Sequence, residues 1–362
     1  MADGSDTITL NARCHCKSNN FDIVVPKSAL PLRSAICQCN SCRHSTGISA
    51  PNSVSFPYNL GIKKPDLSNL TEYKTSAGLP RYFCGTCGAH VCTIELDCWD
   101  VTTGIIDQAG DLLSRLNVWT DDTGDGGFSV YLTENNGKEV QSYRTSSLES
   151  SASKGPVTAE TIAEYKAKSK NIFAAESDEL TESDEKMWCK CHCGGVDFYI
   201  TRPNAKFPGP DPKHMDKNSG LWWLAKGKYR CNPCPCESCR RCSGYEINPW
   251  CYVPKSNVFW KDGTPMQFNE GTLKSYESTP GKVVREFCRV CGAKVFYRAP
   301  ERREPSGVID VSVGLFEGNS RAEDWLKWEP DVGFEDDALD IELFRSINNG
   351  IVKWNKEAEG AE

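Results

Sequence analysis

The alternation of hydrophobic and polar positions along this chain predicts short β-strands more often than helices. In residues 21–25 and again in residues 196–200, apolar side chains occupy every second position, which is the period of a strand with one buried face. Residues 81–96 have the pattern of a strand, a tight turn and a second strand, and residues 101–106 and 128–132 are further β-prone runs. We therefore expect an all-β fold.

One segment, around residues 149–186, departs from this pattern. Its composition shifts to Ser, Thr, Lys, Glu and Ala, and a piece that starts at Thr158 places Ile162 and Tyr165 at helical spacing, with Ile172 as a further candidate. We interpret the segment as a linker with a possible helix. The alternative is that this helix packs on the first half of the chain as its last element.

Cysteines recur along the chain in an ordered pattern that appears twice. Each copy has Cys-His-Cys, then Cys-x-Cys-x-x-Cys-Arg, then Phe-Cys-x-x-Cys-Gly-Ala. The first copy consists of Cys14, Cys16, Cys37, Cys39, Cys42, Cys84 and Cys87, and the second of Cys191, Cys193, Cys234, Cys236, Cys239, Cys288 and Cys291. A length of 362 residues also suits two domains. We predict domains over residues 1–148 and 187–345, the second with an insert at about 205–228, and a polar tail over 346–362.

Composition and charge narrow the class of protein. Hydrophobic residues at 39% and charged residues at 25% are ordinary globular values. The formal net charge of -7 disfavours nonspecific binding to nucleic acid, which depends on clustered Lys and Arg. The chain has no apolar run long enough to span a bilayer and no basic, apolar leader at its start. We expect a soluble protein with reduced thiols in the cytoplasm, with the nucleus as an alternative.

The spacing of the thiols favours zinc, since an iron–sulfur cluster needs four cysteines at a different spacing. Seven ligands in each half can form one closed four-coordinate site and one site with three ligands. We expect the first and last pairs of each half to form the closed sites, because a Cys-x-x-Cys turn offers two ligands and needs a second pair from elsewhere. These sites are Cys14, Cys16, Cys84 and Cys87, and Cys191, Cys193, Cys288 and Cys291. The alternative is a disulfide framework.

The middle three cysteines of each half are the candidates for open, catalytic sites. Three protein ligands plus water or substrate is the arrangement of catalytic zinc. The two sets are Cys37, Cys39 and Cys42, and Cys234, Cys236 and Cys239. Two alternatives remain. One is a structural zinc completed by His44, which has Arg241 as its counterpart in the second half, or by another residue, and the other is a redox thiol cluster without metal.

Other residues near the motifs have less specific interpretations. Arg43 and Arg240 follow the third thiol of each open set and are candidates to hold a substrate carboxylate, with a surface or fold-stabilising role as the alternative. His15 and His192 each stand between two ligands, so we expect them at the rim or in solvent rather than on the metal. The six cysteines that do not repeat are expected to be buried small hydrophobes: Cys92, Cys98, Cys189, Cys231, Cys242 and Cys251.

Taken together, the three cysteine motifs, with a glycine five residues after the middle set (Gly47 and Gly244), resemble the glutathione-dependent formaldehyde-activating enzyme family, which includes centromere-protein-V-like proteins. The resemblance covers both halves. It implies a β-tent type fold, a structural zinc on the outer four cysteines of each half, and a second zinc on the middle three where a thiol substrate binds. It also implies carbon–sulfur lyase chemistry, typified by formation of S-(hydroxymethyl)glutathione.

Two positions depart from the family pattern. The glycine that commonly follows Cys-His-Cys is kept as Gly194 but is Lys17 in the first half. Pro235 stands in the second open set where Gln38 stands in the first, and proline lacks a backbone NH that could stabilise a thiolate or a bound substrate. On this ground the first half is the expected active one.

The combined interpretation is a zinc-dependent carbon–sulfur lyase with about four zinc ions per chain. Its thiol substrate, glutathione or a glutathione conjugate, is expected to bind the open position of a three-cysteine zinc. We also expect the two domains to pack as a pseudo-dimer, without nucleic-acid or membrane partners. A zinc-stabilised interaction module without catalysis, or a metal or redox buffer, would have the same cysteine spacing.

Overall fold

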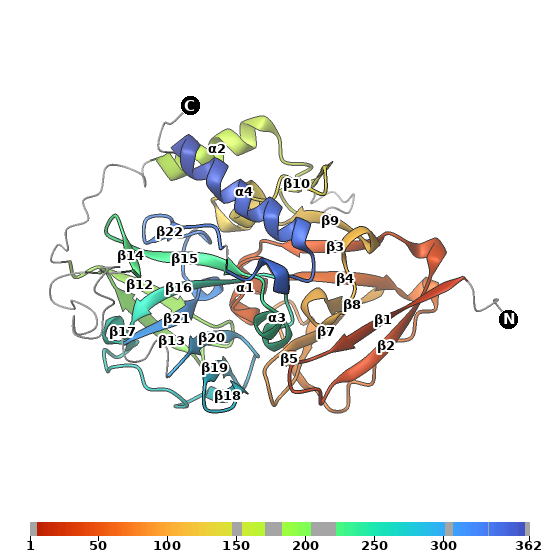
Figure 1. Ribbon diagram of the computed structural model, residues 1–362, viewed down its shortest axis with the longest axis horizontal. Coiled ribbons are helices and arrows are strands. Elements are labelled where there is room, and N and C mark those ends of the chain that lie inside the picture. Colours follow the sequence, from red (N-terminus) through yellow and green to blue (C-terminus); the bar gives the residue numbers. More distant parts are fainter. Residues whose placement is uncertain are drawn as a thin grey trace.

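Strands make up most of the structure and form one large sheet in each half of the sequence (Figure 1). The computed structural model describes residues 6–146, 154–170, 183–203, 222–300, 307–331 and 333–358. Within these residues four α-helices accompany the strands: α1 (Asn40–Thr46), α2 (Ala159–Lys170), α3 (Glu237–Ser243) and α4 (Ile341–Ala358). Of the expected all-β fold, the structure confirms that the described residues form mostly β-sheet. Among the described helices, none has the length and apolar character needed to cross a membrane.

In the N-terminal half, a hairpin precedes a seven-stranded sheet. The hairpin consists of β1 (Thr7–Arg13) and β2 (Asn20–Pro26). In spatial order the sheet contains β5 (Thr71–Lys74), β6 (Pro80–Phe83), β7 (His90–Ile94), β8 (Cys98–Thr102), β4 (Asn52–Pro57), β3 (Leu32–Cys37) and β9 (Leu113–Val118). Neighbouring strands are antiparallel except β3 and β9, which are parallel. Two-residue strands β10 (Glu134–Asn135) and β11 (Lys138–Glu139) follow.

The C-terminal half has the same plan. A small sheet contains β12 (Lys186–Lys190), β13 (Asp197–Thr201) and β17 (Val258–Trp260). The large sheet contains, in spatial order, β14 (Leu224–Ala225), β15 (Lys228–Cys234), β16 (Asn248–Pro254), β21 (Val308–Ser312), β20 (Lys294–Arg298), β19 (Val283–Cys288) and β18 (Leu273–Thr279), and β22 (Leu326–Trp328) pairs with β15 in parallel. Followed from β5 and from β18, seven strands therefore correspond one to one, and the last of each series, β9 and β22, is parallel to its neighbour.

The predicted strand alternation has its physical basis in the hairpin β1–β2. Ile23 and Val25 of β2 are buried, whereas Asp22 and Val24 between them are exposed. Successive side chains of a strand point to opposite faces, so one face of the hairpin packs on the core and the other meets solvent. The same alternation appears in β12, where Met187 and Cys189 are buried and the residues on either side of them are exposed.

The polar tail predicted over residues 346–362 is wrong for its described part. Helix α4 extends to Ala358, and it buries Phe344, Ile347, Ile351 and Trp354 on one face. Apolar residues three and four positions apart line one side of a helix, a spacing that the polar composition of this segment conceals. In Figure 1, α4 lies above both halves with α2 beside it.

The predicted helix in the linker is confirmed as α2, and Thr158 caps its start by accepting from the backbone NH of Thr161 at 3.3 Å. Tyr165 is buried and donates to Asp121 of the N-terminal half at 2.9 Å. The alternative that the helix packs on the first half is therefore the observed arrangement. Ile172 and most of the predicted insert lie outside the described residues.

Two runs that were expected to be strands have another structure. Residues 128–132 belong mainly to a 3-10 helix, Gly127–Val130, and only the first two residues of 101–106 lie in β8 before a second 3-10 helix, Thr103–Ile105. Both runs are buried. Short apolar runs have the same composition in a buried strand and in a buried turn, so the pattern alone does not separate them.

The two halves contact each other through reciprocal hydrogen bonds. The backbone NH of Gly104 donates to the carbonyl of Gly244 at 2.8 Å, and the NH of Gly314 donates to the carbonyl of Gly47 at 3.2 Å. Gly47 and Gly244 end helices α1 and α3 in the left-handed conformation. A Cβ at Gly47 would lie 2.1 Å from the carbonyl oxygen of Lys294, so only glycine allows this approach.

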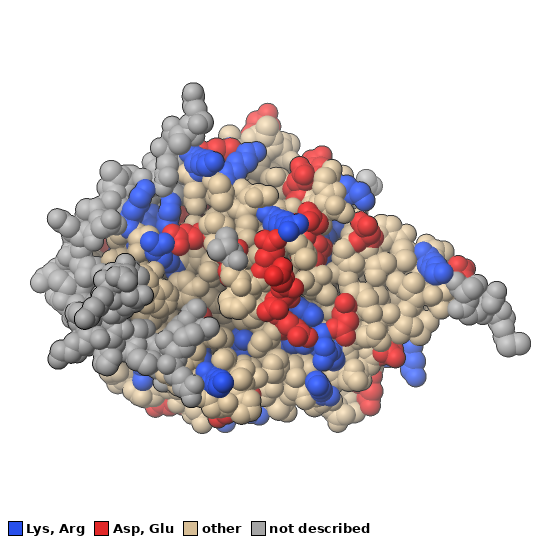
Figure 2. Space-filling model, viewed as in Figure 1, with Lys and Arg blue, Asp and Glu red and all other residues tan. Residues whose placement is uncertain are grey.

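Figure 2 shows one face of the molecule with Lys and Arg interspersed among Asp and Glu, and with acidic side chains gathered along its centre. The start of α4 and the preceding 3-10 helix Glu335–Asp337 lie in this central region in Figure 1. No continuous basic surface appears on the face that Figure 2 presents, in keeping with the net charge of -7.

Candidate metal centres

The outer four cysteines of each half converge into a cluster, as the sequence predicts. In both clusters all four Sγ atoms lie within 4.8 Å of one another: Cys14, Cys16, Cys84 and Cys87, and Cys191, Cys193, Cys288 and Cys291. The Sγ atoms of Cys14 and Cys16 are 3.5 Å apart, and those of Cys193 and Cys288 are 3.6 Å apart. A tetrahedral zinc with Zn–S bonds of about 2.3 Å needs sulfur atoms roughly 3.8 Å apart, so both clusters fit this metal. All twenty cysteines are free thiols, which argues against the disulfide framework.

The tight turn predicted within residues 81–96 is present, and Gly88 in this turn has a φ of 75°. The equivalent turn after each Cys-His-Cys is kept in both halves, because Lys17 has a φ of 62° and Gly194 a φ of 72°. The lysine therefore keeps the turn by adopting a left-handed conformation, which costs a non-glycine residue roughly 1–2 kcal/mol.

The middle three cysteines of each half form the second kind of cluster. Their Sγ atoms also lie within 4.8 Å of one another: Cys37, Cys39 and Cys42, and Cys234, Cys236 and Cys239. Each set begins at the end of a strand, β3 or β15, and ends in the first turn of α1 or α3. The second cysteine caps the helix: Cys39 Sγ accepts from the NH of Cys42 at 3.3 Å, and Cys236 Sγ from the NH of Cys239 at 3.4 Å. A helix start favours negative charge, so these clusters suit thiolates and a metal with three protein ligands.

An arginine that the sequence interpretation did not single out lies against the third thiol of each middle set. Arg81 on β6 donates through Nη2 to Cys42 Sγ at 2.9 Å, and Arg285 on β19 donates through Nη1 to Cys239 Sγ at 3.4 Å. Both arginines stand three residues before the Phe-Cys-x-x-Cys-Gly-Ala cysteine pair, so the repeat itself contains the signal. The guanidinium groups partly neutralise the negative charge of three clustered thiolates.

The shifts in thiol pKa follow from these contacts. Hydrogen bonds from Cys37 and Cys39, followed by the charge of Arg81, hold the pKa of Cys42 well below its usual range. The corresponding contacts from Cys234, Cys236 and Arg285 lower the pKa of Cys239. In the outer cluster, the hydrogen bond with Cys14 is the main cause that lowers the pKa of Cys16 to about 6. Each cluster therefore contains at least one thiol that favours the thiolate, the form that binds metal.

Arg43 and Arg240 are both buried and donate to backbone carbonyls of the opposite half. Arg43 is 1% exposed and donates to the backbone carbonyls of Phe316 and, at 2.9 Å, Gly318 of the opposite half. Arg240 donates to the carbonyl of Gly104 at 2.8 Å, in a mirrored arrangement. This geometry gives both arginines a role in joining the halves, the alternative kept open in the sequence analysis. Their binding of a substrate carboxylate stays a prediction that no contact supports.

Two other sequence arguments are overturned by hydrogen bonds. His44 is not part of the middle cluster, because its Nδ1 donates to the carbonyl of Lys190 at 2.7 Å. The backbone NH of Gln38 is not available to a ligand, because it donates to the carbonyl of Val118 at 2.9 Å. The preference for the first half as the active one therefore loses the ground on which it rested, and it stays an untested prediction.

The six cysteines that do not repeat are mostly buried. Cys92, Cys189, Cys231, Cys242 and Cys251 are buried thiols, as expected for small hydrophobes. Cys98 is partly exposed and lies within 4.8 Å of the carboxylates of Glu95 and Asp97.

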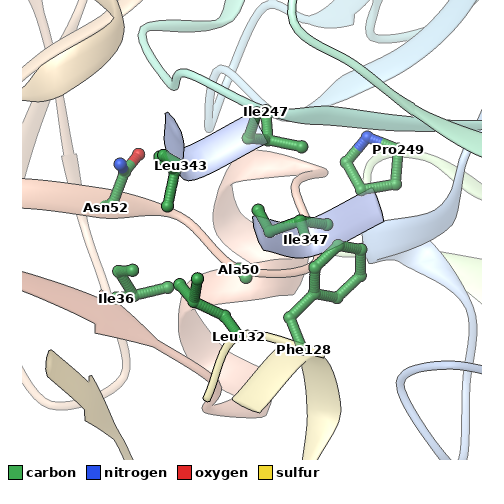
Figure 3. A pocket seen from close by; sticks show the side chains of 9 residues that line it. All are labelled: Ile36, Ala50, Asn52, Phe128, Leu132, Ile247, Pro249, Leu343 and Ile347. Atoms are coloured by element: carbon green, nitrogen blue, oxygen red, sulfur yellow. The ribbon is translucent and has the colours of Figure 1, made fainter. Parts of the chain in front are cut away.

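An apolar cavity lies between the halves beneath α4 (Figure 3). Phe128 and Leu132 of the N-terminal half face Ile247 and Pro249 of the C-terminal half, and Leu343 of α4 lies beside them. Its volume of about 20 Å³ suffices for about one water molecule. No cysteine lines it, so it is a packing gap rather than a substrate site.

Comparison with known families agrees with this arrangement. A model of the glutathione-dependent formaldehyde-activating enzyme family matches residues 9–122 and 225–331, which is more than half of the chain. The chain belongs to this family. The two family regions follow each other in tandem, and the first contains all seven cysteines of its half. The second begins after Cys191 and Cys193, yet the structure places both with Cys288 and Cys291 as in the first. No curated protein sequence matches the chain significantly.

Proposed function

We propose that this protein is a zinc-dependent carbon–sulfur lyase-type enzyme that acts on glutathione or a glutathione conjugate, in the manner of S-(hydroxymethyl)glutathione formation. The observation that carries the proposal is the presence, in both halves of a chain of this family, of one cluster of three thiols and one cluster of four. Four thiols complete a tetrahedral zinc site, whereas three leave one position for a substrate.

Zinc bound to the three thiols would lower the pKa of a thiol at its fourth position and present it as a thiolate. The residues around the thiols support that role. The helix start at α1 or α3 and the guanidinium of Arg81 or Arg285 offset the negative charge of the sulfur atoms. In the forward reaction the sulfur of glutathione forms a bond to the carbonyl carbon of formaldehyde, and the thiol proton ends on the carbonyl oxygen.

The metal content tests the first part of the proposal. We expect close to four zinc ions per chain, two in each half, and we expect the pair on the middle cysteines to be removed first by a chelator because a three-ligand site holds its metal less tightly. Metal analysis before and after chelation gives this count. A content of two ions that supplementation leaves unchanged would contradict the open sites.

The thiol is tested on the cobalt-substituted protein. Glutathione should displace water from the open position and change the absorption spectrum, because a thiolate binds more strongly than water at such a soft site. Cys39→Ser and Cys236→Ser remove one open site each and show which half responds. Product formation from glutathione and formaldehyde is followed in the same variants.

We also propose that the halves form a pseudo-dimer within one chain. Equivalent residues of the two halves make the same hydrogen bonds to the opposite half, as equivalent residues do across a two-fold interface. A zinc-stabilised interaction module is the alternative function. It predicts full metal content with no spectral response of the cobalt protein to any thiol.

A further inference from the structure

The Cys-His-Cys turn of each half contacts the opposite half directly. The backbone NH of His192 donates to the carbonyl of His44 on α1 at 3.0 Å, and the NH of His15 donates to the carbonyl of Arg241 on α3 at 3.1 Å. Helices α1 and α3 also contain Cys42 and Cys239, the third thiols of the open clusters. Each outer cluster is therefore fixed against the helix that holds the open cluster of the other half.

The histidine side chains continue this contact. His192 Nδ1 and Tyr73 Oη are 2.6 Å apart, and His15 Nδ1 and Tyr276 Oη are 2.8 Å apart. In both pairs the histidine and the tyrosine come from opposite halves, and their rings meet edge to face, with centroids 5.7 and 5.6 Å apart. Because the same atoms make this contact at both ends of the interface, it follows from the two-fold relation between the halves.

Each tyrosine stands beside the arginine of its own half. Tyr73 on β5 is the cross-strand partner of Arg81 on β6, and Tyr276 on β18 is the partner of Arg285 on β19. Directly opposed residues of an antiparallel pair project from the same face, with Cβ atoms about 4.5–5.5 Å apart. Since the arginine donates to the third thiol, the tyrosine lies next to the open cluster and the histidine of the opposite half lies next to the tyrosine.

We propose that each open site is shared between the halves. The site of Cys37, Cys39 and Cys42 is completed by Arg81, Tyr73 and His192, and the site of Cys234, Cys236 and Cys239 by Arg285, Tyr276 and His15. The histidine pairs with the hydroxyl of the tyrosine, the tyrosine stands opposite the arginine on the neighbouring strand, and the arginine donates to the third thiol. These are positioning residues, because they act on the metal and on the thiol substrate through that sulfur atom.

The proposal has a consequence for substrate binding, and this part rests on the proposed function. A fourth thiolate adds one more negative charge to a site that already has three, and a guanidinium held in place beside the third thiolate offsets it. The arginine therefore favours a thiolate over neutral water as the fourth ligand. Its orientation depends on a histidine that the other half supplies.

The test reads each open site separately with cobalt as the probe. In full-length Cys236→Ser the open site of the N-terminal half remains, and in Cys39→Ser that of the C-terminal half remains. Into each we introduce His192→Phe or His15→Phe, which keep a ring but lose Nδ1, and Tyr73→Phe or Tyr276→Phe, which lose only the hydroxyl and lie outside the Cys-His-Cys turn. Cobalt affinity is measured by competition with a chelator, and glutathione affinity from the cobalt spectrum.

We expect a crossed pattern. In Cys236→Ser, His192→Phe and Tyr73→Phe should each weaken cobalt binding at the open site roughly threefold, and Arg81→Gln about tenfold, because hydrogen bonds to a metal ligand contribute 10–100-fold to metal affinity. His15→Phe should change the affinity less than about twofold in this background. In Cys39→Ser the effects of His15 and His192 should exchange. Arg81→Lys, which keeps the charge, should recover part of the loss caused by Arg81→Gln.

An uncrossed pattern, in which His15→Phe weakens the site of its own half, would overturn the proposal, and so would the absence of any effect of His192→Phe and Tyr73→Phe. Retention of both outer metals in each variant shows that the turn is intact, and the tyrosine variants decide the question if a histidine variant loses its outer metal. A wild-type protein that does not respond to glutathione would overturn the proposed function alone, because the crossed cobalt affinities are measured without thiol.

Discussion

The two halves of this protein share a strand order and two cysteine clusters, but they are packed differently. The N-terminal sheet has a core of its own, with Leu10, Val54 and Trp99 at its centre. The core of the C-terminal half extends much further, because Phe128 and Trp354 pack in the same cluster as the strands of the second sheet. The repeat therefore defines the unit that holds the metal ligands, whereas the segments after each unit enlarge the core of the second half.

The mirrored contacts between the halves also use different side chains. At equivalent positions of the two repeats, the first half has His44 and His90 and the second half has Arg241 and Lys294, respectively. Lys294 is buried and donates to the carbonyl of Cys87 in the opposite half at 2.8 Å. The backbone of the interface is close to symmetric while its side chains are not, so equivalent substitutions in the two halves provide matched tests.

The largest difference in stability is expected between variants that lose an outer ligand and variants that lose a middle ligand. Cys84→Ser and Cys288→Ser each remove a ligand of a closed site and should destabilise the protein by more than about 5 kcal/mol, because the free energy of structural zinc binding is folding free energy. Cys39→Ser should cost much less. Thermal melts together with metal analysis measure both effects. Equal losses for Cys39→Ser and Cys84→Ser would mean that the two kinds of cluster have the same role.

The joint between the halves contains a buried ion network. Arg115 on β9 pairs with Glu246 after α3 at 2.9 Å and with Asp340 before α4 at 2.9 Å, and all three side chains are buried. Glu246→Ala should destabilise the protein by about 3–5 kcal/mol, because it leaves the guanidinium with a single partner in a buried site.

The matched control for Glu246→Ala is Glu335→Ala, which removes the more exposed pair with Arg345 and should change the free energy of unfolding by about 1 kcal/mol or less. Denaturant unfolding followed by tryptophan fluorescence measures both variants. Because the joint belongs to both halves, we expect one transition in each case. Two transitions in Glu246→Ala would show that the halves unfold independently.

Variants of Arg43 and Arg240, the arginines that follow the third thiols, distinguish a role in the interface from a role in substrate binding. Arg43→Met and Arg240→Met should each cost about 1–3 kcal/mol, because backbone carbonyls of the opposite half lose their donors in a buried site. Glutathione affinity per folded molecule should stay the same. A lower affinity with unchanged stability would instead support the binding of a substrate carboxylate.

The smallest effect concerns the turn after Cys-His-Cys, where the halves differ by one residue. Lys17→Gly should stabilise the protein by about 1 kcal/mol, because glycine adopts a positive φ without steric cost. Gly194→Ala should destabilise it by a similar amount. Chemical denaturation of both variants compares the two turns. A destabilising effect of Lys17→Gly would mean that the lysine side chain contributes more than its backbone strain costs.

The sequence by itself determined the local features of this protein. The pairs and triplets of ligands follow from spacing, since a Cys-x-Cys or Cys-x-x-Cys segment brings its own sulfur atoms together within one turn. The strand β2 follows from the alternation of residues 21–25, and the helix after Thr158 from the spacing of its apolar residues. The positive φ of Gly88 follows from the requirements of a tight turn. All of these depend on neighbours within a few residues.

Only the tertiary structure decided which distant groups meet. Gln38 lost its free NH to Val118, Arg43 reached carbonyls around Gly318, and Arg81 met Cys42, although nothing in the local sequence of these residues names the partner. The apolar face of α4 is buried because residues of the other half pack against it. Buried donors need acceptors and apolar faces need apolar surfaces to cover them. In this protein both come from segments that are distant in the sequence, so local spacing does not predict them.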